Sequence, residues 1–329
     1  MGLFPHAVSQ TAERIKKVRR NIRQTLRFAD DRTFFWVSFV PTALIVLILL
    51  IFPIVFTLVI SFFYKNLLVG PFVFAGLDNF EALLKDPQFW LSFKNGIIYS
   101  GGSTFFSIVF GMFVAMVLNQ NFKGRSILRA IVIFPYIVPP IVALFIWKFL
   151  INSRGIINVI LSDLGIISEY IPWLGDSRYA MITAILISSW VWFPFSAINF
   201  LAGLQGIPQD VYEAAAIDGA SGLESFRHIT VPLLSPVISV MVILRFIWAA
   251  RNFDLIYLLT GGGPVDTTMV LPLLAYKAAF STFRLGYASA VATALFIFLT
   301  ALAMIYFRVY AMTSNLTSSK EPSATGIQP

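Results

Sequence analysis

Residues 33–64 read TFFWVSFVPTALIVLILLIFPIVFTLVISFFY and contain no charged side chain. A helix needs about 20 mostly apolar residues to cross the hydrocarbon core of a bilayer, and this stretch is longer than that. It is also too long for the apolar region of a signal peptide, and no small-residue cleavage site follows it. We therefore expect a membrane-spanning helix that is retained as an anchor.

The composition of the whole chain agrees with a membrane protein. Of the 329 residues, 58% are hydrophobic and 12% are charged, and phenylalanine alone occurs 33 times. Soluble proteins carry about 25% charged residues, so the composition excludes a soluble enzyme. The chain has no cysteine and two histidines, which excludes disulfides and thiolate metal sites and leaves few ligands for zinc or redox chemistry.

Five further stretches are long and apolar enough to span a membrane. Three of them are charge-free gaps, which lie between Lys94 and Lys123, between Arg178 and Asp210, and between Arg284 and Arg308. The other two, about 130–151 and about 232–257, contain basic residues that need separate explanations. A shorter apolar stretch from Met269 to Phe280 predicts an interfacial or re-entrant piece, because it is about half a bilayer long. We therefore predict an all-α integral membrane protein with six transmembrane helices.

The basic residues predict the orientation of these spans. Of the 24 Lys and Arg residues, 14 fall in the two tails and in the loops after the second and fourth spans, and 7 fall in the other loops. Because cytoplasmic loops are enriched in Lys and Arg, we expect both termini to be cytoplasmic. The predicted organisation is a basic amphipathic tail over 1–32, a six-span membrane domain over 33–310 and a disordered cytoplasmic tail over 311–329.

The N-terminal tail places apolar residues at helical spacing among arginines. These residues are Ile15, Val18, Ile22 and Leu26. The pattern is typical of an amphipathic helix that lies on an anionic lipid surface. A nucleic-acid-binding arm is the alternative; such tails usually serve topology, and we expect no nucleic acid partner.

The longest cytoplasmic loop of this topology, about 205–232, reads QGIPQDVYEAAAIDGASGLESFRHITVP. Its proline start, its early acidic residue and its alanine run predict a short helix that ends near Gly219. A second short helix is expected from about Leu223, stopping before Pro232. Small side chains allow another protein to approach closely, so the loop favours a docking element over a plain connecting turn.

This loop resembles the EAA motif of ABC importer permeases, which is Glu-Ala-Ala, three residues, Gly, nine residues, Ile-x-Leu-Pro. The matching residues are Glu213, Ala214, Ala215, Gly219, Ile229 and Pro232, with Val231 in place of the leucine. Other segments are similar to the carbohydrate branch of these permeases, which includes the maltose and glycerol-phosphate systems. They are Gly76–Phe80, Asp86–Trp90, Phe93–Asn95, Asn252–Tyr257, Thr260–Pro264 and Gly286–Ala290.

The resemblance implies a type I ABC importer permease that moves sugars by alternating access in the inner membrane of a bacterium. It implies four kinds of protein and substrate partner: a second, related permease, two ATP-binding cassette ATPase subunits, an extracytoplasmic solute-binding protein and a sugar. ATP and Mg²⁺ would be bound by the ATPase subunits, with no cofactor on this chain. Coupling to the ATPases would rest on Glu213, Ala214, Ala215 and Gly219.

The sequence offers no catalytic machinery and no metal site. It contains no Gly-x4-Gly-Lys-Ser/Thr loop, and Gly261–Gly263 precedes a proline and predicts a turn. The two histidines, His6 and His228, lie in the tail and in the EAA loop, without a nucleophile and base set. An ion-coupled secondary transporter is the main alternative, although it would usually show internal repeats and carboxylates within the membrane. A membrane-embedded transferase and a peptide or phosphate permease are further alternatives.

Two stripes of polar and aromatic residues predict the substrate pathway, because polar residues within spans usually face the bundle interior. Each stripe repeats at i, i+4, i+7 and i+11, which places its members on one helical face. The fourth-span stripe is Ser188, Trp192, Phe195 and Asn199, and the fifth-span stripe is Met241, Arg245, Trp248 and Asn252. Aromatic rings beside hydrogen-bonding groups suit a sugar, and plain interhelical packing is the alternative.

Arg245 lies near the middle of the predicted fifth span. It could bind a carboxylate or phosphate on the substrate through two hydrogen bonds, or it could pair with an acid of the partner permease or with backbone carbonyls. Lys148 and Arg251 lie closer to the span ends and can extend to the interface. Kinks are expected at the prolines within spans, which are Pro53, Pro135, Pro139, Pro140 and Pro194.

Overall fold

The computed structural model describes the backbone of residues 31–318 and the side chains of residues 35–310. The chain divides into two compact units, 1–59 and 60–329. The predicted amphipathic helix of the N-terminal tail lies outside the described residues. The long apolar stretch forms α2 (Asp31–Val46), the π-helical turn η1 (Leu47–Ile51) and α3 (Phe52–Ile60), all within the first unit except the last residue of α3.

The π-helical turn η1 ends two residues before Pro53. Proline lacks an N–H, and its ring clashes with the carbonyl four residues before it in a regular α-helix. A wider turn relieves this clash while the helix continues. The disturbance predicted at Pro53 therefore takes the form of a π turn.

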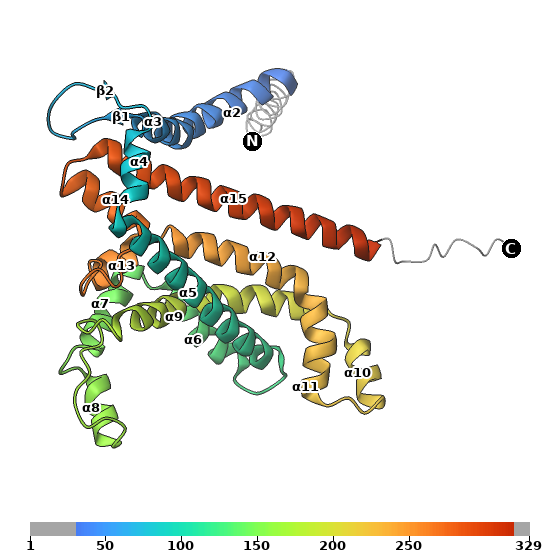
Figure 1. Ribbon diagram of the computed structural model, residues 1–329. Coiled ribbons are helices and arrows are strands. Elements are labelled where there is room, and N and C mark those ends of the chain that lie inside the picture. Colours follow the sequence, from blue (N-terminus) through green and yellow to red (C-terminus); the bar gives the residue numbers. More distant parts are fainter. Residues whose placement is uncertain (1–30, 319–329) are drawn as a thin grey trace, which may run out of the picture. The chain divides into compact units, whose positions relative to one another are not determined.

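The second unit is almost entirely helical (Figure 1). It begins with a small antiparallel hairpin in which Phe63 pairs with Phe74 and Tyr64 with Val73. Its elements are β1 (Phe63–Tyr64), β2 (Val73–Phe74), α4 (Asp78–Lys85), α5 (Pro87–Asn119), α6 (Arg125–Ile137), α7 (Pro140–Leu150), α8 (Ile156–Asp163), α9 (Ala180–Gln205), α10 (Gln209–Ile217), α11 (Gly222–Ser225), η2 (Phe226–Thr230), α12 (Val231–Ala250), α13 (Asp254–Leu259), α14 (Leu271–Phe280) and α15 (Leu285–Ser318).

The structure confirms an all-α membrane protein. Among the described residues, five helices are long and apolar enough to cross a membrane, or six if the bent pair α6 and α7 is one span. The third span is therefore not a continuous helix, because α6 and α7 meet at 97°. Val138 and Pro139 each precede a proline and adopt the extended backbone that this position favours. The kink predicted at Pro139 and Pro140 is confirmed.

Three predicted boundaries in the second half of the chain are wrong. The fifth span ends at Ala250 instead of near residue 257, and a separate helix, α13, follows. The second helix of the long loop does not stop before Pro232, because α11, η2 and α12 form one continuous helix. The π turn η2 ends two residues before Pro232, just as η1 precedes Pro53. Finally, α15 continues to Ser318, past residue 310, where the sequence predicts the start of a disordered tail.

Close packing of α5 against α9 forms the centre of the second unit. A Cβ atom added to Gly111 would lie 2.5 Å from Cβ of Ser196, so only a glycine lets the two helices approach this closely. A cluster of buried apolar residues surrounds α14, whose Leu273 and Leu274 belong to it. The predicted short apolar piece is thus a helix packed within the protein.

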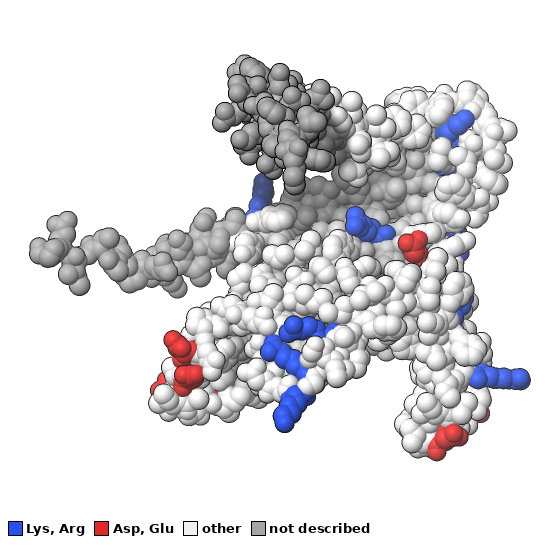
Figure 2. All heavy atoms as spheres, turned by 180° about the vertical axis from the view of Figure 1, so that it is seen from behind, with Lys and Arg blue, Asp and Glu red and all other residues white. Residues whose placement is uncertain are grey.

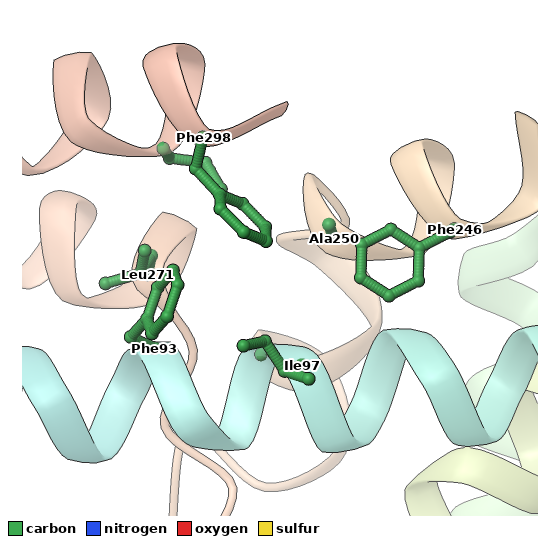
Figure 3. Close-up of a pocket in the computed structure, with 8 residues that line it drawn as sticks. Phe93, Ile97, Phe246, Ala250, Leu271 and Phe298 are labelled. Atoms are coloured by element: carbon green, nitrogen blue, oxygen red, sulfur yellow. The ribbon is translucent and has the colours of Figure 1, made fainter. Parts of the chain in front are cut away.

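A small apolar crevice lies between α5, α12, α14 and α15. Phe93, Phe246 and Phe298 contribute their rings to its lining (Figure 3). The rings of Phe93 and Phe298 lie edge to face, with centroids 5.0 Å apart. These contacts join α5 to α15 without any polar group.

The two ends of the second unit differ. The helices α10 and α11 lie at one end of α9 and α12, whereas α7, α8 and α13 lie at the other (Figure 1).

The segment after α8 is held by buried Asn158, whose side-chain amide donates to the carbonyl of Ile171 and accepts from the N–H of Ile171. Farther along, hydrogen bonds from the guanidinium and the N–H of Arg178 lower the pKa of Asp176.

Candidate functional site

Four aromatic side chains from three helices form a cluster in the second unit. They are Tyr136 of α6, Trp192 and Phe195 of α9, and Trp248 of α12. The ring centroids of Phe195 and Trp248 are 5.1 Å apart, and those of Trp192 and Trp248 are 6.2 Å apart. Tyr136 lies 6.0 Å from Trp192 and 6.1 Å from Phe195. Three of these residues belong to the predicted stripes, so the structure brings the two stripes together here.

Arg245 is buried beside this cluster, with 1% of the residue exposed. Its guanidinium carbon lies 5.1 Å from the ring centroid of Trp192, within cation–π distance. Among the described residues, neither Nε nor Nη2 of Arg245 has a hydrogen-bond partner. A charged group that is buried without hydrogen bonds is solvated less favourably than in water, by roughly several kcal/mol.

A buried hydrogen bond connects α5 to the fourth-span stripe. The hydroxyl of Tyr99 donates to Oγ of Ser188 over 3.0 Å, and both residues are buried. The sequence prediction named Ser188 but missed Tyr99 and Tyr136. The available signal for Tyr99 was a hydroxyl group within the charge-free gap between Lys94 and Lys123. The signal for Tyr136 was its position just before the tandem prolines Pro139 and Pro140.

Three other members of the two stripes, Asn199, Met241 and Asn252, do not join the cluster. Met241 is buried in a core cluster with Phe200 and Leu234. Nδ2 of Asn199 donates to the carbonyl of Phe195 in its own helix. Asn252 lies beyond the end of α12, where its Oδ1 accepts from the N–H of Leu255 over 3.1 Å, so its predicted place on the helical stripe is wrong.

A cavity of about 330 Å³ adjoins the cluster. Pro139 and Pro140 line it at the α6–α7 bend, and Trp192 lines it from α9. Asn252 lines it from the turn between α12 and α13, and Asp254 lines it from the start of α13, so Asn252 lies near Trp192 although it is outside α12. The residues of this cavity combine apolar surface with an amide and a carboxylate.

The short helix predicted in the long loop is present as α10 and is accessible. The helix α10 has no buried residue and begins directly after Pro208, with Asp210 in its first turn. Glu213 accepts a hydrogen bond from Nε2 of Gln209 and is exposed. Ala214 and Ala215 lie on the same helix.

Gly219 ends α10 in the way the sequence predicts. Its φ is +81°, a left-handed value that favours glycine. The N–H of Gly219 bonds to the carbonyl of Ala216, and the N–H of Ala220 bonds to that of Ala215. This pair of bonds is the Schellman motif that commonly closes a helix.

Two polar contacts orient the segment that contains α10. The hydroxyls of Tyr212 and Thr230 are 2.9 Å apart, which ties α10 to η2. Ser221 and Glu224 form a reciprocal capping box at the start of α11. These contacts leave Ile217 and Leu223 exposed, at 87% and 77%.

The charges at this end of the molecule are separated by sign. Acidic side chains gather on the tip that α10 and α11 form, and basic side chains gather beside it over the start of α6 (Figure 2). The acidic residues of the tip are Asp210, Glu213, Asp218 and Glu224. Across the described part of the chain, no group of three metal-ligating side chains is present.

Comparison with solved structures identifies the fold. The chain is similar to a chain of a bacterial ABC transporter involved in the import of the acidic polysaccharide alginate, with a TM-score of 0.72 and 23% identity. The match covers 87% of this chain and 99% of the other. The fold implied by the resemblance to ABC importer permeases is therefore confirmed.

Comparison with known sequences identifies the family. The chain is 37% identical over 290 residues to the trehalose/maltose transport system permease protein MalF of Thermococcus litoralis, covering 88% of this chain and 97% of that protein. It is 32% identical over 282 residues to the sulfoquinovosyl glycerol transport system permease protein SmoG of Agrobacterium fabrum, covering 85% and 91%. Residues 107–313, which contain the aromatic cluster, Arg245 and α10, match one family model. The chain thus belongs to the family of binding-protein-dependent transport system inner membrane components.

Proposed function

We propose that this chain is the permease subunit of an ATP-driven, binding-protein-dependent sugar importer that works by alternating access. One observation carries the proposal: the exposed helix α10 lies in the loop between α9 and α12, which are two of the three helices that supply the aromatic cluster. The named cargoes of two relatives, trehalose or maltose and sulfoquinovosyl glycerol, are sugars. Aromatic rings beside hydrogen-bonding groups are suited to such a ligand.

The continuous helix from Gly222 to Ala250 suggests how a signal passes along the molecule. It begins next to α10, and the contact between Tyr212 and Thr230 links the two. Trp248 lies 26 residues beyond Gly222, which corresponds to about 39 Å of helix. Movement of α10 by a docked subunit would therefore shift the position of Trp248 against α9.

We assign docking on the ATPase subunits to α10 and the turn after it. Glu213, Ala214, Ala215 and Gly219 would form the surface that enters the ATPase, and exposed Ile217 and Leu223 would add apolar contact. ATP and Mg²⁺ would be bound by those ATPase subunits, and this chain would be non-catalytic. In this orientation α10 and both termini are cytoplasmic, and the end with α8 is extracytoplasmic.

The remaining partners follow from the family. A binding-protein-dependent system needs an extracytoplasmic solute-binding protein, and the relatives named MalF and SmoG are permease components of transport systems. We further propose that a second, related permease completes the pair. Lipid surrounds the exposed apolar helices.

The aromatic cluster defines the part of the pathway that we assign to substrate. Trp192, Phe195 and Trp248 would stack on the sugar, with Ser188 and Arg245 supplying polar contacts. Asn252 would contact the sugar from the adjoining cavity. We leave Met241 and Asn199 out of this set, because one is packed in the core and the other bonds to its own helix.

The ion-coupled secondary transporter has no support. The family consists of binding-protein-dependent systems. In addition, α5, α6, α7, α9, α12 and the described part of α15 contain no Asp or Glu that could bind a coupling ion.

The test is transport by the complete complex in proteoliposomes, with the ATPase subunits inside and the cognate binding protein outside. Uptake of radiolabelled maltose, trehalose and uronate-containing disaccharides is measured with and without ATP. We expect uptake of at least one sugar that requires both ATP and the binding protein. Uptake that follows an ion gradient without ATP would refute the proposed function.

A further inference from the structure

Arg245 is enclosed by side chains of its own chain. The single chain leaves 1% of the residue exposed, and the ring of Trp192 covers the guanidinium at 5.1 Å. An acid on a second permease therefore cannot reach it in this conformation. Any counter-ion for Arg245 would have to come from within this chain or from a ligand.

The described part of the chain supplies no such counter-ion. The membrane helices of the second unit contain no Asp or Glu within their described bounds. Asp254 lines the same cavity as Trp192, but the salt bridges of the described residues, Lys85–Glu81 and Arg178–Asp176, do not include Arg245. A buried cation without a partner is unfavourable, because its lost hydration is not replaced.

The unpaired atoms of Arg245 have a specific arrangement. Nε and Nη2, the two buried atoms without a partner, lie on the same edge of the guanidinium plane. Two parallel N–H groups on one edge match the two oxygens of a carboxylate or a sulfonate. Hydroxyls of a neutral sugar can accept from these donors, but they leave the buried positive charge without a counter-ion.

Trp192 connects Arg245 to the space that a ligand can occupy. Its ring contacts the guanidinium, and the same residue lines the cavity of about 330 Å³. Trp192 packs against Tyr136 and Trp248 on two other helices, so separation of α6, α9 and α12 would free its ring. Arg245 would then face the cavity.

We infer that the cargo is an anionic sugar and that Arg245 binds its carboxylate or sulfonate through Nε and Nη2. This inference rests on the proposed function and adds the substrate class. The conformation described here buries the cation unpaired, and an anionic ligand satisfies it when the helices part. A ligand of this charge would therefore favour the open conformation more than a neutral sugar of the same size would.

The first test compares matched sugars with the complete complex in proteoliposomes. The probes are a disaccharide with a terminal glucuronate, its counterpart with terminal glucose, and a sulfoquinovose-containing glycoside. We expect the wild type to prefer an acidic probe, and Arg245→Met to reduce uptake of that probe by about 10- to 100-fold, the loss expected for hydrogen bonds to a charged group. Arg245→Lys should restore only part of the uptake, because lysine presents a point charge without a two-donor edge.

Arg251, six residues after Arg245, provides a matched control. Arg251 is exposed just beyond the end of α12, so Arg251→Met removes an equal charge without touching the buried site. Its uptake should equal that of the wild type, and gel filtration verifies that each variant complex is assembled. Uptake of the acidic probe that is equal in the wild type and Arg245→Met, or wild-type uptake of the neutral counterpart that is as fast as that of the acidic probe, would overturn the anionic cargo while leaving the proposed importer intact. If the wild type shows no ATP-dependent uptake of any probe, the result would instead count against the proposed importer.

A second measurement does not depend on the choice of probes. The cognate binding protein is purified from its native host, and the sugar that it releases on denaturation is identified by mass spectrometry. A uronate or sulfonated sugar supports the inference. A neutral sugar as the released cargo overturns it, whatever the transport assay gives.

Discussion

At the scale of single residues, Gly219 is a position where backbone conformation alone determines what a substitution does. Its φ of +81° disfavours any residue with a Cβ, yet a Cβ there would meet no atom within 4 Å. We predict that Gly219→Val strains the turn by about 1–2 kcal/mol and lowers ATP-dependent uptake severalfold, with normal amounts of protein in the membrane. Uptake into proteoliposomes and membrane immunoblots measure the two quantities.

Gly222 provides the control for this prediction. A Cβ at Gly222 would also meet open space, but its backbone lies outside the left-handed region. Gly222→Ala should therefore transport like the wild type. If Gly219→Val and Gly222→Ala transport equally well, the left-handed turn has no role in coupling.

The two predicted stripes show how far periodicity reaches at this scale. Spacing of i, i+4, i+7 and i+11 places four residues on one face, but that face is about 16 Å long. Trp192, Phe195 and Trp248 meet because α9 and α12 approach each other there, whereas Met241 faces the core. Tyr136 joins from a third helix, and no pattern within one helix can indicate which other helix will pack against it.

At the scale of secondary structure elements, the approach of α5 to α9 depends on the absence of a side chain at Gly111. A Cβ there would lie 2.5 Å from Ser196 Cβ and 3.0 Å from the backbone nitrogen of Ala197. Gly111→Ala should push the helices apart and destabilise the fold by about 1–3 kcal/mol. Thermal unfolding in detergent, followed by gel filtration, should show a lower midpoint.

Gly101 lies on the same helix and serves as the control. A Cβ atom at this position would have no other atom within 4 Å, so Gly101→Ala should keep the midpoint of the wild type or raise it slightly, since alanine favours helix. Equal midpoints for Gly111→Ala and Gly101→Ala would contradict the close-packing argument.

The bend between α6 and α7 gives a second prediction for elements. Replacement of both Pro139 and Pro140 by alanine removes the restriction on Val138 and Pro139 that keeps the backbone extended. The chain contains no cysteine, so Ile131→Cys and Phe149→Cys can carry spin labels without background. We expect the distance between labels to lengthen toward about 27 Å, the length of 18 helical residues. An unchanged distance would mean that packing, and not proline, sets the bend.

Prolines explain why element boundaries were only partly predictable. Pro135 and Pro194 lie inside α6 and α9, which continue through them. Pro232 follows the π turn η2 in a continuous helix, whereas the tandem Pro139 and Pro140 stand at the 97° bend between α6 and α7. A single proline removes one hydrogen bond, which a wider turn can accommodate, whereas two in succession restrict two preceding residues.

At the scale of the whole molecule, the tip formed by α10 and α11 differs from the membrane helices that expose apolar residues. Ile217 and Leu223 stand among the acidic residues of the tip, where lipid would not be expected to cover them. Apolar residues surrounded by charge are typical of a protein interface, because burying them against a partner removes them from water. In the proposed orientation that partner is the ATPase subunit.

We predict that Ile217→Asp reduces co-purification of the ATPase subunits by at least about tenfold, because a buried aspartate would lose hydration without gaining a counter-ion. The tagged permease is isolated from membranes, and the bound ATPase is quantified on gels. Leu164→Asp is the matched control, since Leu164 is an apolar residue that is 67% exposed at the opposite end of the second unit, after α8. Capture that falls equally in both variants would indicate a general defect of folding, whereas capture that falls in neither would show that the ATPase does not contact Ile217. Loss in Ile217→Asp alone would place the ATPase beside α11, where the continuous helix toward Trp248 and Arg245 begins.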